Sequence, residues 1–313
     1  MDLIKAVALD GILIAVIGHG LVGVSLVWDK VLLQKRSTQS LLSYVFWLGV
    51  ISIFGLLLIP FGFKLPRFQV AALGFGAGVL DLIASYFYYS ALKLGEASEE
   101  LAVMGGFTPV ATALIAMPLL KAPLENQFTG FMLMTSGGFL MFLAERRPLK
   151  RMLPKILIAS AAFGLTSVLQ KVVFNQTNFV SGYVFFTFGT FIGSACLAIP
   201  LSWRKQIFKH SGSGEPRSKV WYLVNRITAG VGSFLVVFAV SRASPPVVES
   251  ISGVRYAVIF VLAYAITRWK PSWLREEFGA WILATKVAST LLVIAGLILV
   301  GLHGGRGGSR GPR

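Results

Sequence analysis

Long apolar runs alternate with short polar connections along almost the whole chain. An α-helix rises about 1.5 Å per residue, so roughly 20 residues cross a hydrocarbon core about 30 Å thick. Each run of that length predicts a membrane-spanning helix, because open strands cannot satisfy their backbone groups in lipid. The ten predicted spans are 8–28, 41–61, 69–92, 99–120, 128–144, 155–174, 182–202, 220–240, 245–267 and 280–302.

The composition favours the same class, an all-α integral membrane protein. Hydrophobic residues make up 55% of the 313 residues and charged residues 13%, and the mean hydropathy is +0.75. A soluble chain of this length would suggest two domains, but little polar sequence is left to coat one. We attribute the net charge of +16 to loops that set orientation and meet anionic lipid, and expect no nucleic-acid binding.

The two ends of the sequence predict different things. The run from Ala6 to Val27 is long for the apolar part of a signal peptide, and no A-x-A-like cleavage site follows it, so we expect a retained first helix. The Gly/Arg-rich tail 304–313 is predicted to be disordered.

Several landmarks recur in order and predict an internal duplication. Span one ends in Trp28-Asp29-Lys30 and span six in Leu169-Gln170-Lys171, and spans five and ten both carry a late glycine step. The predicted units are a first five-helix repeat, 1–148, and a second, 149–303. An odd number of spans per unit inserts the second copy upside down, as in many secondary transporters. Coincidence among low-complexity apolar segments is the alternative.

Few ionisable or strongly polar groups lie inside the spans, where a charge costs about 2.5–3.5 kcal/mol on insertion scales and is expected to face a cavity or a partner. The candidate cavity residues, which would bind substrate, are Asp81, Arg226, Arg255, Tyr256, His19, Tyr88 and Glu249. The candidates at equivalent helix ends are Lys30 and Lys171.

These candidates also have structural interpretations. Asp81 is either a coupling or substrate group or the ion-pair partner of Arg226 or Arg255. Arg226 either faces the cavity or extends to the headgroups from near a helix end. His19 has no carboxylate near it in sequence, which favours a hydrogen bond to a neighbouring helix. Glu249 follows two prolines, so it can occupy a first helical turn, where the helix dipole favours an acid. The two helix-end lysines can serve as interfacial anchors.

Other chemistry is missing from the sequence. No G-x-x-x-x-G-K-[ST] loop is present, so ATP is not expected to drive the chain directly. One cysteine, Cys196, and three scattered histidines predict neither an internal disulfide nor a metal site. No nucleophile–base pair is visible, so we expect no enzyme activity and no cofactor. The mid-span Gly74, Gly76 and Gly78 predict close helix packing rather than phosphate binding.

One junction carries a family resemblance. The segment from Tyr89 to Ser98, YSALKLGEAS, leads into an apolar helix with Pro109. It resembles the EamA-like branch of the drug/metabolite transporter superfamily, whose junctions read aromatic-A-L-x-x-x-x-A-S before a helix with a central proline. An Asp-Lys ending of helix one and the Arg255-Tyr256 pair are similar to one bacterial subgroup. The resemblance implies ten helices, a central cavity and alternating access.

The loops predict an orientation. Lys and Arg concentrate in the loops after spans one, five, seven and nine, which places those loops in the cytoplasm and both termini outside. The resemblance implies the opposite, because characterised ten-helix relatives usually keep both termini in the cytoplasm.

The function expected from these patterns is secondary transport of small organic solutes or metabolites across the cytoplasmic membrane. Two inverted halves would rock around a midplane cavity, driven by a solute, proton or sodium gradient. Arg255 would hold an anionic or polar substrate, and Asp81 would balance charge or carry a proton. The alternative is a flippase for a lipid-linked intermediate, or an accessory subunit of an envelope enzyme. A lateral opening to lipid, with basic residues at its rim, would favour the flippase.

Overall fold

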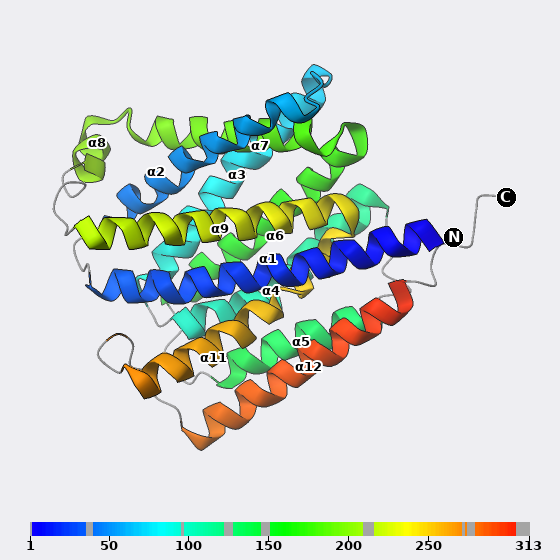
Figure 1. Cartoon of the computed structure of the whole chain (residues 1–313), viewed down its shortest axis with the longest axis vertical. Helices are drawn as coiled ribbons and strands as arrows, with labels where there is room; N and C mark the ends of the chain where they lie inside the picture. The colour runs from blue at the N-terminus through cyan, green and yellow to red at the C-terminus, as the bar shows by residue number, and fades with distance from the viewer. Residues whose placement is uncertain are drawn as a thin grey trace.

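The computed structural model describes residues 2–35, 40–94, 97–121, 128–144, 151–208, 216–270, 273 and 279–304. Within these ranges every regular element is a helix. The longer helices run along one common direction, and α1 begins at the same end of the bundle at which α12 ends (Figure 1). The helices are α1 (Asp2–Lys35), α2 (Leu41–Ile51), η1 (Ser52–Phe61), α3 (Phe68–Leu92), α4 (Ala97–Leu120), α5 (Phe128–Ala144), α6 (Leu153–Gln176), α7 (Phe179–Leu197), α8 (Leu201–Phe208), α9 (Pro216–Arg242), α10 (Pro245–Ser250), α11 (Gly253–Trp269) and α12 (Ala280–Gly304).

Seven of the described segments are long and apolar enough to cross a membrane. They are Gly11–Asp29, Leu41–Phe61, Phe68–Leu92, Leu153–Gln176, Phe179–Leu197, Leu223–Arg242 and Pro245–Trp269. Three shorter apolar segments, Met104–Leu120, Phe128–Leu140 and Leu283–Gly296, lie in α4, α5 and α12. The length and composition of these helices define an all-α, multi-pass membrane protein, as the sequence predicts.

The structure corrects the end of one predicted span and shows irregular backbone inside two others, 41–61 and 245–267, which are both confirmed as apolar segments of spanning length. The span predicted at 182–202 ends early, because α7 stops at Leu197 and the separate helix α8 begins after Pro200. The span 41–61 changes from α-helix to 3-10 helix at Ser52. Its hydroxyl donates to the carbonyls of Gly49, at 2.6 Å, and Thr187, at 2.9 Å. The span 245–267 is broken at Ile251 and Ser252, between α10 and α11.

The packing of α3 against α7 depends on glycine. A Cβ atom on Gly78 would lie 1.9 Å from the Phe186 carbonyl oxygen, and one on Gly189 would lie 2.0 Å from that of Phe75. Only glycine allows the two backbones to approach so closely. Gly74 also faces α7, where its Cβ would lie 3.2 Å from Phe185. The predicted packing role is confirmed for Gly74 and Gly78 and is wrong for Gly76, because a Cβ there would meet no atom within 4 Å.

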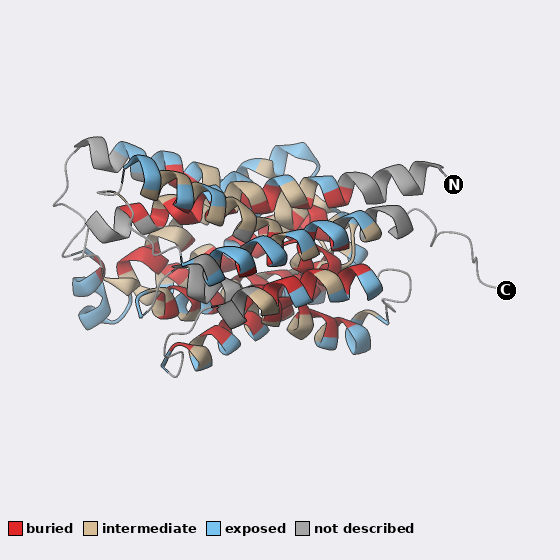
Figure 2. Ribbon diagram, turned by 90° about the horizontal axis from the view of Figure 1, so that it is seen from below, coloured by how far each residue is buried: buried red, intermediate tan, exposed pale blue. Residues whose placement is uncertain are grey.

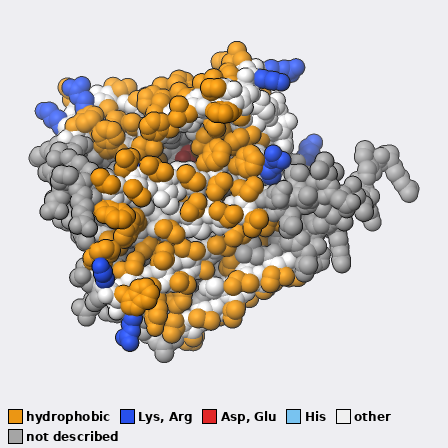
Figure 3. All heavy atoms as spheres, viewed as in Figure 1, with side chains coloured by type: hydrophobic (Ala, Val, Ile, Leu, Met, Phe, Trp, Pro, Cys, Tyr) orange, Lys and Arg blue, Asp and Glu red, His pale blue; other side chains and the backbone are white. Residues whose placement is uncertain are grey.

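The outer surface of the bundle is apolar, and its interior holds buried residues of both kinds. Buried positions face the inside of the bundle in Figure 2, and hydrophobic side chains cover the face shown in Figure 3. Leu57 and Leu114 are 67% and 66% exposed, whereas Asp29, Arg226 and His19 are buried. This distribution is the one expected where the surrounding solvent is lipid.

Candidate functional site

A cavity of about 700 Å³ lies inside the bundle, bounded by α1, α2, η1, α3, α4, α6, α7, α9 and the α10–α11 segment. Its volume falls in the range of small-molecule sites. The sequence candidates that line it are His19, Asp81, Tyr88, Arg226, Glu249 and Arg255. The chain therefore brings together residues more than 200 positions apart. The side chain of the remaining candidate, Tyr256, lies outside the described residues.

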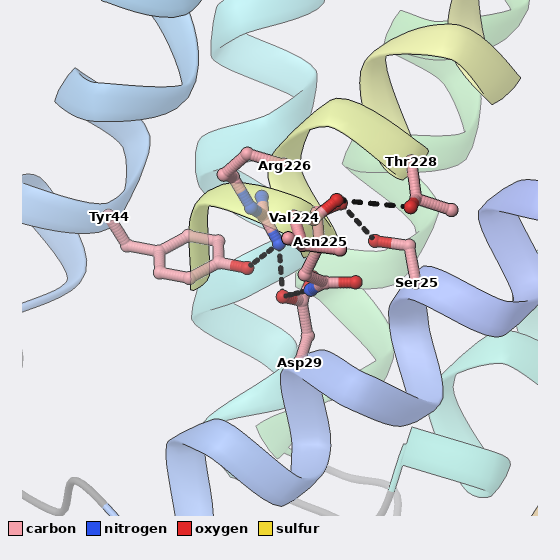
Figure 4. Close-up of polar contacts among 7 residues, drawn as sticks. All are labelled: Ser25, Asp29, Tyr44, Val224, Asn225, Arg226 and Thr228. Atoms are coloured by element: carbon pink, nitrogen blue, oxygen red, sulfur yellow. Dashed lines mark hydrogen bonds and ion pairs between the residues drawn. The ribbon is translucent and has the colours of Figure 1, made fainter. Parts of the chain in front are cut away.

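A buried polar cluster joins three helices at one end of the cavity (Figure 4). Asp29 of α1 and Arg226 of α9 form an ion pair, and Asn225 donates to the same Asp29 oxygen at 2.6 Å. Arg226 also donates to the Tyr44 hydroxyl of α2 at 2.6 Å. The cluster thus ties α1, α2 and α9 together, and each charge in it has an opposite charge or a hydrogen bond.

This cluster corrects two interpretations of Arg226. Its side chain is 4% exposed and paired with Asp29, so it does not extend to the headgroups. It is also not the ion-pair partner of Asp81. Sequence reasoning missed Asp29 because the predicted span ended one residue before it. One signal was available in the sequence: Asp29 directly follows an apolar run of helical length. Because α1 continues to Lys35, this acid lies inside the helix rather than in a loop.

His19 connects α1 to the break between α10 and α11. The Ser252 amide donates to the Glu249 carbonyl at 3.0 Å, which leaves the Val248 carbonyl without its regular helical donor. His19 Nε2 supplies one at 2.9 Å, and Arg255 donates to His19 Nδ1 at 2.9 Å. A carbonyl only accepts and a guanidinium only donates, so these partners require the neutral Nε2–H tautomer. The predicted hydrogen bond from His19 to a neighbouring helix is confirmed.

Glu249 and Arg255 lie on the two sides of the same break, and both line the cavity. Glu249 accepts a hydrogen bond from Ser167 of α6, is attracted by Arg255 and is repelled by Asp81. Glu249 is the fifth residue of α10, whose first turn contains no acid. The first-turn interpretation is therefore wrong, because the carboxylate points to α6 and the cavity rather than to the helix start.

Asp81 and Glu249 are the two acids that line the cavity, and in the described part of the chain neither forms an ion pair with a basic side chain. Glu249 accepts a hydrogen bond from Ser167 and is attracted by Arg255, whereas the charge that acts on Asp81 is the like charge of Glu249. Two hydroxyls on the cavity wall also lack a hydrogen-bond partner in that part of the chain. They belong to Thr108 of α4 and Thr166 of α6, which are 5% and 3% exposed. A buried hydroxyl without a partner costs free energy, so these groups are suited to a polar ligand.

The remaining candidates lie outside this centre. Lys171 Nζ donates to the Ser241 carbonyl of α9 at 3.1 Å, which makes it a tie between two helices. The side chain of Lys30 is not among those described. In the described ranges, no group of three or more His, Cys, Asp or Glu side chains is arranged to hold a metal ion.

Comparison with known proteins extends the fold assignment only. No family model matches the sequence, and the search of curated proteins also finds no match. A solved structure described as "Crystal structure of protein" superposes with a TM-score of 0.58 over 91% of this chain and 96% of that chain. The two sequences are 16% identical, so the likeness shows a shared fold and carries no information on substrate.

Proposed function

We propose that this protein is a secondary transporter of small organic solutes or metabolites, located in the cytoplasmic membrane and similar to the EamA-like family. Two inverted five-helix repeats, 1–148 and 149–303, would alternate around the cavity. The helix packing supports this: α1 packs on α9 as α3 packs on α6, and α5 packs on α12 as α2 packs on α7. In an inverted repeat α1 corresponds to α6 and α3 to α9, so the α1–α9 contact is the counterpart of the α3–α6 contact. Because α2 corresponds to α7 and α5 to α12, the other two contacts each join a helix to its own counterpart.

The observation that carries the proposal is the charged cavity itself. Asp81, Glu249 and Arg255 line one cavity between helices whose outer faces are apolar. A charge at this depth is costly and marks a ligand or ion pathway by default. We assign Asp81 to charge balance or coupling. Arg255 is less suited to hold an anion, because its guanidinium already donates to His19 and is attracted by Glu249.

Two clusters of side chains lie at opposite ends of the cavity, and each end would open in turn during transport. The Asp29–Arg226–Tyr44 cluster spans one end. Toward the other end, aromatic rings of α7 and α9 meet, with centroid distances of 5.2 Å for Tyr183–Phe234 and 4.9 Å for Phe179–Phe238. Opening the first end would break charged hydrogen bonds, whereas opening the second would separate apolar rings. Alternating access therefore exchanges one kind of contact for the other.

Proteoliposomes test this proposal. The purified chain is reconstituted, loaded with a labelled metabolite mixture, and followed under imposed proton and sodium gradients. We expect gradient-dependent exchange of at least one solute, and we expect Asp81→Asn to abolish the coupled component while the variant stays folded. Gly76→Ala, at a position in open space, is the matched control. Transport that is unchanged in Asp81→Asn would remove Asp81 from the mechanism, and no exchange of any solute would remove the transporter.

The second candidate is a flippase for a lipid-linked intermediate, and one observation favours it. The cavity opens through the side of the bundle between η1 and α9, where Phe54 and Ile227 line it and are exposed (Figure 3). A flippase in proteoliposomes would move a fluorescent polyprenyl-phosphate lipid between leaflets without any solute gradient. A solute transporter would leave that lipid in place.

A further inference from the structure

The cavity has an opening in the long side of the bundle. α2 and η1 pack on α7, and α9 packs on α1, but among the described residues α9 shares no extended interface with α2 or η1. Figure 3 shows the result: a hollow in the apolar face, with acidic atoms visible at its base. Because spanning helices run across the bilayer, an opening on their long side faces lipid.

The rim of this opening is apolar and has space for a chain. Phe54 of η1 and Ile227 of α9 line the cavity and are 65% and 59% exposed. Val231 lies one turn after Ile227 and is also exposed. Between them, Gly230 lines the cavity, and a Cβ there would meet no atom within 4 Å. An alkyl chain in this gap would contact protein on both sides and lipid at its end.

Among the described side chains in and beside the cavity, acids outnumber basic groups. The carboxyl groups of Asp29, Asp81 and Glu249 lie with the guanidiniums of Arg226 and Arg255, which is three against two. Asp29 is paired with Arg226 and Glu249 is attracted by Arg255, so Asp81 is the described acid that has no basic neighbour. The neutral His19 adds none. An unbalanced carboxylate in a cavity bordered by lipid favours a cationic group.

The walls around Asp81 add two further features that suit such a group. Tyr88, Phe163 and Tyr183 line the same cavity, and the faces of aromatic rings attract ammonium ions, more strongly when the ion is desolvated. The unpartnered hydroxyls of Thr108 and Thr166 can accept hydrogen bonds from an amine.

We propose that this cavity binds an amphipathic amine or quaternary ammonium, with its cationic head at Asp81 and its apolar chain in the gap between η1 and α9. This substrate class rests on the proposed transport function for its biological meaning, but binding itself does not require transport. The ligand would reach the site from the bilayer rather than from the water at either end.

The test uses a photoreactive alkyltrimethylammonium probe with a diazirine in its chain, added to the full-length protein in phosphatidylcholine nanodiscs. Mass spectrometry locates the labelled residues. We expect labelling on η1 and α9 that excess dodecyltrimethylammonium prevents, and that dodecanoate or tetramethylammonium does not. Asp81→Asn should reduce this competable labelling by about tenfold or more, equivalent to one decade of affinity, and Asp81→Glu should restore most of it.

A second pair of variants tests the opening between η1 and α9. Gly230→Trp fills the opening and should reduce labelling, whereas Gly76→Trp adds the same ring in open space on α3 and should leave it unchanged. Thermal unfolding of each variant checks that it is folded. Equal labelling in Asp81→Asn, equal competition by dodecanoate, or unchanged labelling in Gly230→Trp would overturn the proposal. Labelling as expected with no solute flux in proteoliposomes would instead reject the transport function and keep the site.

Discussion

Asp29 and Arg226 carry opposite charges into the apolar part of the bundle and neutralise each other there. Removing one partner of a buried pair leaves an uncompensated charge, which typically costs about 3–5 kcal/mol. We therefore expect Asp29→Asn and Arg226→Gln each to lower the thermal unfolding temperature strongly. The double variant should lose much less than the sum, because neither charge remains.

A double-mutant cycle in one detergent measures this coupling. Arg204→Gln on α8, where the side chain is exposed, is the control and should change stability by no more than about 0.5 kcal/mol. Strictly additive losses for Asp29 and Arg226 would show that the pair does not stabilise the fold.

The sequence identified the costly residues of this site but not their partners. Asp81, Arg226, Arg255, Glu249 and His19 stand out because a charge or an imidazole inside an apolar run needs a cavity or a partner. Their pairing depends on which helices meet: Asp29 and Arg226 are 197 positions apart, and no local pattern connects them. Cavity hydroxyls such as Thr108 and Thr166 carry no signal at all, since threonine is common in membrane helices.

At the scale of the helix, glycines two residues apart on α3 make a direct comparison. Gly78→Ala places a methyl group 1.9 Å from the Phe186 carbonyl oxygen of α7. The two helices must separate, and we expect a loss of about 1–3 kcal/mol, as for other overpacked sites. Gly76→Ala meets no atom within 4 Å and should be neutral or stabilising by up to about 1 kcal/mol, because alanine favours the helix. Thermal unfolding of both variants in the same detergent measures the difference. An equal change in stability in the two variants would show that the contact with Phe186 does not set the effect.

The bounds of a helix were predictable from the sequence where they depend only on the length of its apolar run. The predicted span 128–144 coincides with α5. The departures occur where an interhelical contact overrides the local pattern. The break at Ile251–Ser252 is stabilised by His19 of α1, and the 3-10 stretch that begins at Ser52 is tied to Thr187 of α7. Neither distant partner is visible from the segment it alters. The end of α7 differs, because Pro200 was a local signal that the apolar run concealed.

At the scale of the whole molecule, the charges of the loops predict the direction of the bundle in the membrane. α8, with Arg204 and Lys205, lies at one end of the bundle, and the loop that joins η1 to α3 and contains Lys64 lies toward the opposite end (Figure 1). In the sequence, the loops after the first, fifth, seventh and ninth predicted spans, the seventh being the one that follows α7, carry most of the Lys and Arg, and we expect loops of this kind to stay in the cytoplasm. In a Cys196→Ser background we expect Lys64→Cys to react with an impermeant maleimide in intact spheroplasts, and Lys205→Cys to react only after permeabilisation. Both positions are exposed, so access depends on the side of the membrane.

The reverse pattern would place both termini in the cytoplasm, as the family resemblance implies, and the Asp29–Arg226 cluster would then lie toward the outside. Labelling of both positions from outside would contradict a bundle that spans the membrane.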